Sequence, residues 1–194
     1  MNDFIKMMVN RRTIRRFKQE QIKSDELEQI LQAGLFAPNA GGRQSAIIVV
    51  CQNAAMNDEL GQLNRQTETI VNPSPGRISF EQPSILDDIN IKNAFYSAPT
   101  VLTLFARKDI YNLTGDCFVA AENMVIAAQS IGIGSCIVGR SSMTFATERG
   151  REIQTAWGIS DEFEARIHVV FGYPLDETPP KAKPRNDGRV IFAK

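Results

Sequence analysis

Residues 116–131 of this 194-residue chain read DCFVAAENMVIAAQSI, and this stretch decides the fold class. It is rich in alanine and apolar nearly all round at helical spacing, so we expect a helix that is buried on most sides. Apolar, β-branched runs at 98–107 and 165–174 predict buried strands on either side of it in the sequence. The stretch therefore predicts a domain in which strands and helices pack around a central helix.

The segments further out supply the other elements of this domain. Helices are expected over residues 3–10, from residue 24 to the proline at 38, over 57–70 and over 144–157, with a third strand at 46–51. The run 134–139 is short and apolar, and 72–84 holds three prolines and is expected to be irregular. Helices and strands interleave without repeats. This pattern favours one mixed α/β or α+β domain over residues 1–194.

The tail that begins at residue 175 is rich in proline and then ends in an apolar alternation at 190–192. Such an ending is too apolar for a disordered tail. We expect residues 175–194 to form an extended arm that pairs with a sheet edge, in its own subunit or in a partner's.

Composition excludes several classes of protein. The chain has 22 basic and 22 acidic residues, which argues against a general attraction to nucleic acid or to an anionic membrane. No apolar run approaches the length of a membrane span, and the N-terminus does not resemble a signal peptide. Three widely spaced cysteines are typical of buried thiols in a reducing compartment, so we expect a cytoplasmic protein.

The chain offers few side chains for acid–base or nucleophilic catalysis. His168 is its only histidine and lies in the middle of a predicted strand, and Cys136 lies among apolar residues, so a structural role is favoured for both. No cluster of cysteine, histidine and acidic residues predicts a metal site. The glycine-rich run 132–139 fails as a nucleotide-binding loop because a helix, and not a strand, precedes it. If the chain is an enzyme, a cofactor is expected to carry the reaction.

Residues 11–17 read RRTIRRF, which places four guanidinium groups within six residues of a neutral chain. In an extended segment, Arg11, Thr13 and Arg15 would point to one side. Two guanidinium groups with a hydroxyl between them form a suitable site for a phosphate monoester. Lys183 and Arg185 form a second cationic pair in the tail. Together the two clusters predict an anionic ligand that is bound from both ends of the chain.

Several motifs, taken in order, resemble the FMN-dependent nitroreductase-like flavoproteins. They are RRTIRRF, the helix and loop ILQAGLFAPNAGGRQ, the strand APTVLTLFA, the central stretch GDCFVAAENMVIAAQSIGIGSCIVG, then VVFGYP and the closing KPR. The resemblance covers essentially the whole chain. It implies an α+β, three-layer α/β/α sandwich with a mostly antiparallel central sheet flanked by helices. It also implies an intertwined homodimer with FMN at the interface, in which residues 175–194 dock on the partner.

The resemblance implies an oxidoreductase that transfers electrons from NAD(P)H through bound FMN to a small electron-poor acceptor, in a ping-pong mechanism. No side chain is expected to be catalytic, because flavin N5 carries the hydride. Two alternatives stay open. One is another flavin reaction on the same scaffold, such as dehydrogenation of a metabolite or reductive dehalogenation, and the other is an FMN-binding protein without catalysis.

The residues that the resemblance implies for FMN binding come from several segments. Arg11, Thr13 and Arg12 would bind the phosphate and ribityl chain, with Arg15 toward the pyrimidine edge. Asn39, Ala40 and Gln44 match positions that contact the cofactor from the partner. Asn93, or in its place Asn90, would bind the flavin. The remaining implied residues are Cys136, Ile137, Val138 and Gly139 beside the ring, and Lys183 and Arg185 at the phosphate.

Two departures from the family pattern bear on this assignment. Gln44 is followed by Ser45 and Ala46 in place of proline and tryptophan, which removes a bulky aromatic side chain before the strand. Asn39 replaces a serine, so the loop after Pro38 differs from that of the family.

Overall fold

The computed structural model of the protein describes residues 1–67, 79–110 and 113–193. Within these ranges four strands form one sheet in the order β1-β2-β4-β3, and every neighbouring pair is antiparallel. The strands are β1 (Ile47–Cys51), β2 (Thr100–Arg107), β3 (Gly134–Val138) and β4 (Phe163–Gly172). The three predicted strands are confirmed, and the short apolar run at 134–139 is the fourth.

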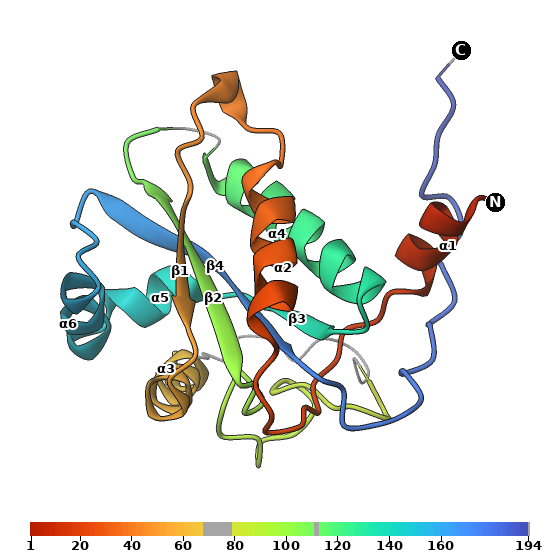
Figure 1. Ribbon diagram of the computed structural model, residues 1–194, viewed down its shortest axis with the longest axis horizontal. Helices are drawn as coiled ribbons and strands as arrows, with labels where there is room; N and C mark the ends of the chain where they lie inside the picture. Colours follow the sequence, from red (N-terminus) through yellow and green to blue (C-terminus); the bar gives the residue numbers. More distant parts are fainter. Residues whose placement is uncertain (68–78, 111–112, 194) are drawn as a thin grey trace.

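Helices cover both faces of the sheet (Figure 1). The helices are α1 (Asp3–Asn10), α2 (Ser24–Leu35), α3 (Ala54–Gln66), α4 (Leu113–Ser130), α5 (Ser141–Ala146) and α6 (Glu148–Ala156), with the short 3-10 helix η1 (Ala40–Gly42). Alternation along β2 separates two cores. Leu102 and Leu104 pack with α2 and α4, whereas Val101 and Phe105 pack on the face covered by α3, α5 and α6. The predicted sandwich of helices around an antiparallel sheet is confirmed.

The central helix α4 packs closely against α2. A Cβ atom at Gly34 would lie 2.0 Å from Cε of Met124, so a larger residue there would require the Met124 side chain to move. The prediction of a largely buried helix holds for the side of α4 that faces α2. It does not hold for Phe118 and Val119, which are 44% and 40% exposed. An apolar strip of α4 therefore remains open on the single chain.

Two predicted helix boundaries are wrong. The predicted helix at 144–157 is two helices, because the backbone of Thr147 is extended and its Oγ1 caps α6 by accepting from Gly150 N at 3.0 Å. The helix predicted at 57–70 begins at Ala54, capped by Asn53, and ends at Gln66. Residues 68–70 of that helix, and residues 72–78 of the predicted irregular segment, lie outside the described residues.

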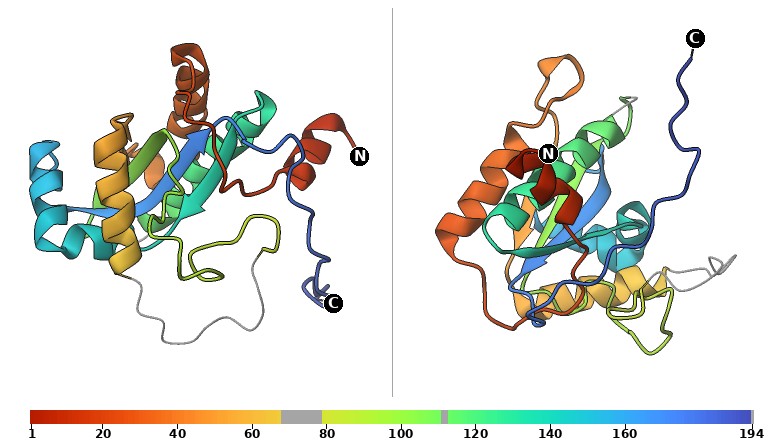
Figure 2. Two further views of the ribbon diagram at one scale, coloured as in Figure 1. Left: turned by 90° about the horizontal axis from the view of Figure 1, so that it is seen from below. Right: turned by 90° about the vertical axis from the view of Figure 1, so that its right-hand side faces the viewer.

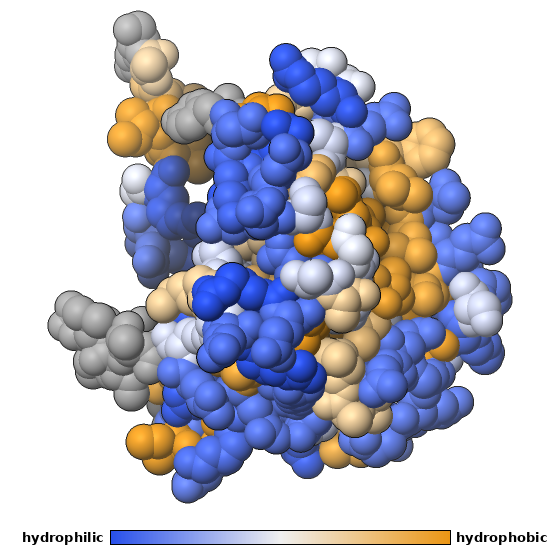
Figure 3. Space-filling model, turned by 90° about the vertical axis from the view of Figure 1, so that its left-hand side faces the viewer, coloured by the Kyte–Doolittle hydropathy of each residue, from blue (hydrophilic) through white to orange (hydrophobic). Residues whose placement is uncertain are grey.

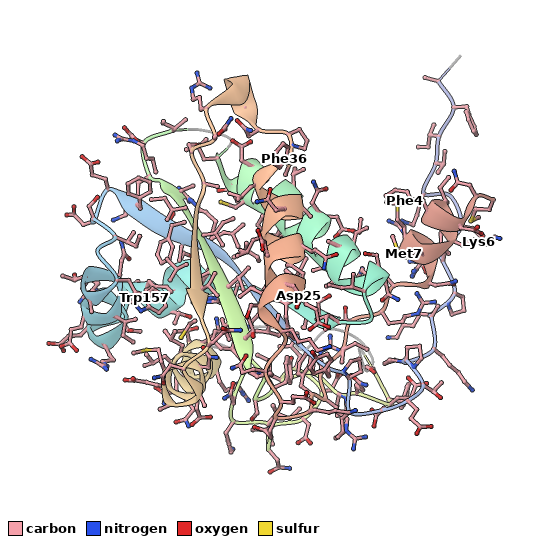
Figure 4. The ribbon with its side chains drawn as sticks, in the orientation of Figure 1. Phe4, Lys6, Met7, Asp25, Phe36 and Trp157 are labelled. Atoms are coloured by element: carbon pink, nitrogen blue, oxygen red, sulfur yellow. The ribbon has the colours of Figure 1, made fainter. Side chains whose placement is uncertain are left out.

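The two ends of the chain stand away from the sandwich. Helix α1 buries none of its residues, and Phe4 is 60% exposed (Figure 4). The arm overlaps α1 in Figure 1 but lies apart from it in the right-hand view of Figure 2. Residues 181–193 are all exposed, and the run 190–192 forms no strand within this chain. A pairing of the arm with its own sheet is therefore not found.

Candidate functional site

The cationic segment 11–17 lies beside β3. Ile14 N donates to Ser135 O at 2.9 Å, Thr13 forms an isolated bridge with Ser135, and Phe17 forms one with Pro174. The side chains of Ile14 and Phe17 are buried in the core. The expectation of an extended segment is confirmed here, and its apolar residues anchor it while its arginines are half-buried or exposed at the sheet edge.

Two of the four arginines are engaged locally. The guanidinium of Arg12 donates to Val9 O at 2.8 Å and to Arg11 O at 2.7 Å, at the C-terminal end of α1. A cation is favourable at this position because the helix ends in free carbonyls. Arg16 pairs with Asp176 at 3.1 Å. Arg16 is thus ion-paired at the surface, and a contact of Arg12 with a phosphate stays a prediction.

Arg11 and Arg15 are different. Neither forms an ion pair with a carboxylate among the described residues. Arg15 instead donates from Nη1 to Gln82 O at 3.2 Å and lies 5.7 Å from the centre of the Tyr96 ring. Its Nε is buried and has no hydrogen-bond partner within the same part of the chain. The segment therefore presents two cations whose charge the described residues do not neutralise.

Residues 136–138 belong to β3, beside segment 11–17, and Gly139 begins the loop after this strand. Ile137 is 38% exposed, whereas Cys136 and Val138 are buried. Burial raises the pKa of the Cys136 thiol to about 11, although the nearby charges of Arg15 and Arg11 act in the opposite direction. The thiol is therefore protonated near neutral pH, which agrees with a structural role for this cysteine.

The loop after β3 is held by Asn64, which the sequence did not single out. This residue of α3 is fully buried, and its Nδ2 donates to Gly139 O at 2.8 Å and to Thr144 Oγ1 at 3.0 Å. The backbone of Arg140 has a positive φ of 63° at the start of α5. A buried polar group with two partners in the chain fixes its neighbours firmly. The position of Gly139 therefore depends on α3.

The loop between α2 and β1 carries the residues implied for the partner's cofactor. The side chain of Asn39 accepts from Gln44 N at 2.9 Å, and Ala40 N donates to both carboxylate oxygens of Asp116, at 3.0 and 3.1 Å. Gly41, Gly42 and Gln44 have positive φ values of 64°, 63° and 49°. Asn39 thus shapes the loop through its side chain. Asp116, at the start of α4, is a second residue that the sequence did not single out.

This loop also borders a cavity of about 540 Å³ with the end of α2 and Asp116. Ser45 and Ala46 line it, and the hydroxyl of Ser45 is buried without a hydrogen-bond partner among the described residues. Phe36 lies at the rim and is 83% exposed (Figure 4). The structure places this loop at the opposite end of α2 from segment 11–17 (Figure 1). A single chain therefore does not bring Asn39, Ala40 and Gln44 to Arg11 and Arg15.

Asn93 is close to Arg15, but its amide is engaged within the chain. Both residues line a second cavity, of about 520 Å³. Asn93 Nδ2 donates to Asp58 Oδ1 at 2.7 Å, and its Oδ1 accepts from Phe95 N at 2.7 Å. Asn90 is exposed on the same segment. The structure thus places Asn93 beside the cationic segment, with its side chain holding the chain before β2.

Lys183 and Arg185 lie in the exposed arm. The start of the arm touches segment 11–17, since Leu175 N donates to Arg16 O at 2.9 Å, and residues 181–193 beyond it are exposed. The two-ended binding of an anion therefore stays a prediction.

His168 lies inside the sheet, where it is fully buried and its Nδ1 is 2.9 Å from Thr103 Oγ1. Burial lowers its pKa to about 3, so the ring is neutral at ordinary pH. This agrees with a structural histidine. No three acidic, cysteine or histidine side chains in the described ranges come together in a way that could hold a metal ion. The helices in these ranges include none that is long and apolar enough to cross a membrane.

Comparison with known proteins identifies the family. The sequence model of the Nitroreductase family matches residues 8–173. The chain therefore belongs to the Nitroreductase family, and it is an oxidoreductase. A protein of Archaeoglobus fulgidus, provisionally named NADH dehydrogenase/NAD(P)H nitroreductase, is 26% identical over 178 residues, which are 91% of this chain and 88% of that protein.

Solved structures share the fold over the whole chain. A nitroreductase with bound FMN from Bacteroides fragilis has a TM-score of 0.83 at 23% identity, and all of both chains is covered. Iodotyrosine deiodinase bound to FMN and 3-iodo-L-tyrosine has a TM-score of 0.72 at 20% identity, with 98% of this chain and 99% of that chain covered. The predicted family and fold are confirmed.

Proposed function

We propose that the protein is an FMN-dependent oxidoreductase that passes electrons from NAD(P)H to an electron-poor acceptor, such as a nitroaromatic or a quinone, in a ping-pong mechanism. One observation carries the proposal. Arg11 and Arg15 project from one extended segment beside β3, and neither is paired with a carboxylate among the described residues. A phosphate and an electron-rich ring edge are the groups that such donors bind best. These residues therefore fit FMN.

Each segment of the site has a part in the proposal. Arg11 and Thr13 would bind the phosphate and the ribityl chain, and Arg15 would stabilise negative charge at the pyrimidine edge. The backbone of residues 136–139 would line the ring and offer an N–H near N5. FMN held by these residues would supply the redox chemistry, which is hydride transfer from a nicotinamide and electron transfer to an acceptor.

Protons are proposed to come from solvent. Among the described residues close to this site, the Cys136 thiol is kept protonated by a pKa of about 11. His168 is buried within the sheet and is neutral. The chain's own contribution is thus to bind, orient and stabilise charge, without a side chain that exchanges a proton with substrate.

A second copy of the chain would complete the site. The chain exposes 11,544 Å², whereas about 9,200 Å² is expected for a monomer of its mass. The excess of about 2,300 Å² per chain, or about 4,600 Å² for two chains, is within the total area that obligate dimers bury. We propose a homodimer in which residues 175–194 dock on the partner. Lys183, Arg185 and the loop with Asn39, Ala40 and Gln44 would then reach the partner's cofactor.

The open apolar surfaces support this assembly. Helix α1 exposes Phe4 and Val9, and the arm exposes Ile191 and Phe192 at 88% and 86%. Strand β1 is an edge of the sheet, and Val50 on it is 37% exposed. Figure 3, viewed from the side on which β1 and α6 lie, shows hydrophobic side chains gathered between hydrophilic ones. If the arm of one subunit paired with the β1 edge of the other, the exposed apolar residues of the arm and of β1 would both be covered.

One alternative has an observation in its favour. The deiodinase of the comparison has the same fold and was solved with FMN and an iodinated tyrosine, so reductive dehalogenation is the second candidate reaction. A cytoplasmic location remains part of the proposal, and the three free, buried cysteines support it.

Anaerobic spectroscopy of the purified protein tests the proposal. We expect a yellow protein that is bleached by NADH or NADPH and is reoxidised by nitrofurazone. Bleaching followed by reoxidation only with a halogenated phenol would favour the alternative. Bound flavin that no nicotinamide reduces would indicate binding without this catalysis, and a protein that takes up no FMN would contradict the proposal.

A further inference from the structure

Three segments that are distant in sequence meet next to Arg15. Leu175 N donates to Arg16 O at 2.9 Å, and Lys18 N donates to Tyr173 O at 2.9 Å, so the chain entering the arm runs beside the cationic segment. The segment that begins at residue 79 contacts both through Gln82. The start of the arm, the cationic segment and residues 79–88 therefore form one junction.

Gln82 lies at the centre of this junction and is only 2% exposed. Its Oε1 accepts from Arg15 N at 2.5 Å, and its Nε2 donates to Asp176 Oδ2 at 3.0 Å. Its main-chain oxygen accepts from Arg15 Nη1 at 3.2 Å. One buried residue thus holds both the backbone and the guanidinium of Arg15.

The partners of Gln82 fix the orientation of its amide. The Arg15 N–H can only donate, and the carboxylate of Asp176 can only accept, so oxygen must face Arg15 and nitrogen must face Asp176. Asp176 is itself fixed by its ion pair with Arg16 at 3.1 Å. A buried amide with both ends satisfied in this way has one orientation, because an exchange of its two ends would face Arg15 N–H with a donor and the Asp176 carboxylate with an acceptor.

The same segment also fixes the other side of Arg15. The guanidinium lies 5.7 Å from the centre of the Tyr96 ring, and Tyr96 Oη accepts from Ile85 N at 3.4 Å. Tyr96 has a positive φ of 55°, a conformation that costs energy for a residue with a side chain and persists only where surrounding contacts hold it. Residues 82–85 therefore restrain the guanidinium directly through Gln82 and indirectly through Tyr96.

We propose that Gln82 is a positioning residue that holds Arg15 against the pyrimidine edge of FMN and thereby sets the reduction potential of the bound flavin. This inference rests on the proposed function, because Arg15 acts on the flavin only if FMN binds beside β3. A fixed cation stabilises the extra negative charge of reduced flavin more than it stabilises the oxidised form. If the cation is free to move away, it stabilises reduced flavin over oxidised flavin by a smaller amount.

Substitution Gln82→Met tests the inference, with Gln154→Met as the matched control. Gln154 is also a buried glutamine, but its Nε2 donates to Ser160 O at 3.0 Å and Phe163 O at 3.1 Å, beside α6. For Gln82→Met we expect reduced FMN to lose about tenfold more affinity than oxidised FMN. This corresponds to a fall of about 30 mV in the two-electron midpoint potential. Gln154→Met should lose stability and keep the wild-type potential.

Hydrogen exchange in the apoprotein gives a readout that needs no flavin. Exchange of the peptide spanning residues 11–17 should become faster in Gln82→Met and stay slow in Gln154→Met. Should Gln82→Met not fold, Gln82→Asn carries the same comparison, because its shorter side chain cannot reach both Arg15 and Asp176.

Failure of the inference and failure of the proposed function give different results. A wild-type protein that binds FMN, together with a position-82 variant of unchanged potential, would overturn the positioning role and leave the function intact. A wild-type protein that binds no FMN would overturn the proposed function and this inference with it.

Discussion

Charge clustering at residues 11–17 is explained differently for each arginine. Arg12 donates to carbonyls at the end of α1, and Arg16 pairs with Asp176, so local contacts account for both. Arg11 and Arg15 remain without a carboxylate partner in the described part of the chain. Sequence alone indicated that an anion was needed. It also set Arg16 apart as an exposed or ion-paired residue, but it could not separate Arg12 from Arg11 and Arg15, because that division depends on where α1 ends.

Asn64 is the residue through which α3 is expected to affect the cofactor site. Replacement Asn64→Leu removes the donor to Gly139 O and Thr144 Oγ1, so we expect the loop after β3 to loosen and FMN affinity to fall about tenfold. Flavin fluorescence titration measures this loss. The matched control is Asn57→Leu on the same helix, since Asn57 Nδ2 donates to Cys51 O and Pro99 O, away from β3. Equal affinity losses in both variants would contradict a specific effect of Asn64.

His168 predicts a dependence of stability on pH. Burial lowers its pKa from 6.5 to about 3, so the unfolded chain takes up a proton below about pH 6.5 while the folded chain does not. Acid therefore favours unfolding through this window. Between pH 7.5 and 5.5 we expect this residue to account for a loss of about 1.4 kcal/mol in the free energy of unfolding. Denaturant titrations should show that this change of pH lowers the free energy of unfolding of wild type by about 1.4 kcal/mol more than that of His168→Leu. An equal loss in both proteins would contradict this role of His168.

At the level of elements, apolar runs were a good guide to type and a poorer guide to ends. The strand at 165–174 and the helix around residues 116–130 were predictable because each is a nearly continuous apolar run, β-branched in the strand and long and alanine-rich in the helix. The break between α5 and α6 was missed. There, a Cβ at Gly150 would lie 2.2 Å from Thr144 O, and this close contact between two helices is not visible in a periodic pattern.

The loop between α2 and β1 was predicted to contact a cofactor, but the residue that holds it was not. Asp116 lies 76 residues from Ala40 in sequence, and only the packing of α4 brings its carboxylate to the loop. The available signal was an acidic residue in the first turn of the central helix, which is also explained by the helix dipole. Local sequence thus could not distinguish the two explanations.

Substitution Asp116→Ala tests this contact. Hydrogen bonds to a charged group contribute about 1.5–3 kcal/mol, so we expect a loss of that size in the free energy of unfolding. We also expect weaker FMN binding if the loop reaches the partner's cofactor. Glu122→Ala, at an exposed position on the same helix, is the control and should change neither quantity. Unchanged stability in Asp116→Ala would show that the Ala40 contact is unimportant.

At the level of the whole molecule, one chain does not bring all the segments of the proposed site together. Segment 11–17 and β3 meet within one chain, and the start of the arm joins them through Leu175, whereas the α2–β1 loop lies at the opposite end of α2. The apolar ending of the arm was recognised from its sequence. Its docking position was not predictable, because an edge strand in one subunit and the same edge in a partner present identical hydrogen-bonding groups.

Substitution Phe192→Asp tests the assembly. Because Phe192 is 86% exposed in the single chain, a charge there should hardly affect the fold of the monomer. Buried against a partner, the same charge would weaken the dimer severely. Light scattering after size-exclusion chromatography should show a dimer for wild type and for the control Asp187→Ala, and monomer for Phe192→Asp. A Phe192→Asp protein that remains fully dimeric would argue against docking of the arm.

Equilibrium binding of FMN to the apoprotein tests the central claim most directly. In the double variant Arg11→Ala/Arg185→Ala, each subunit loses one cation from the segment beside β3 and one from the arm. Since each charged hydrogen bond contributes about 1.5–3 kcal/mol, we expect the dissociation constant of FMN to rise at least hundredfold over wild type. Retention of wild-type affinity by the double variant would contradict the account.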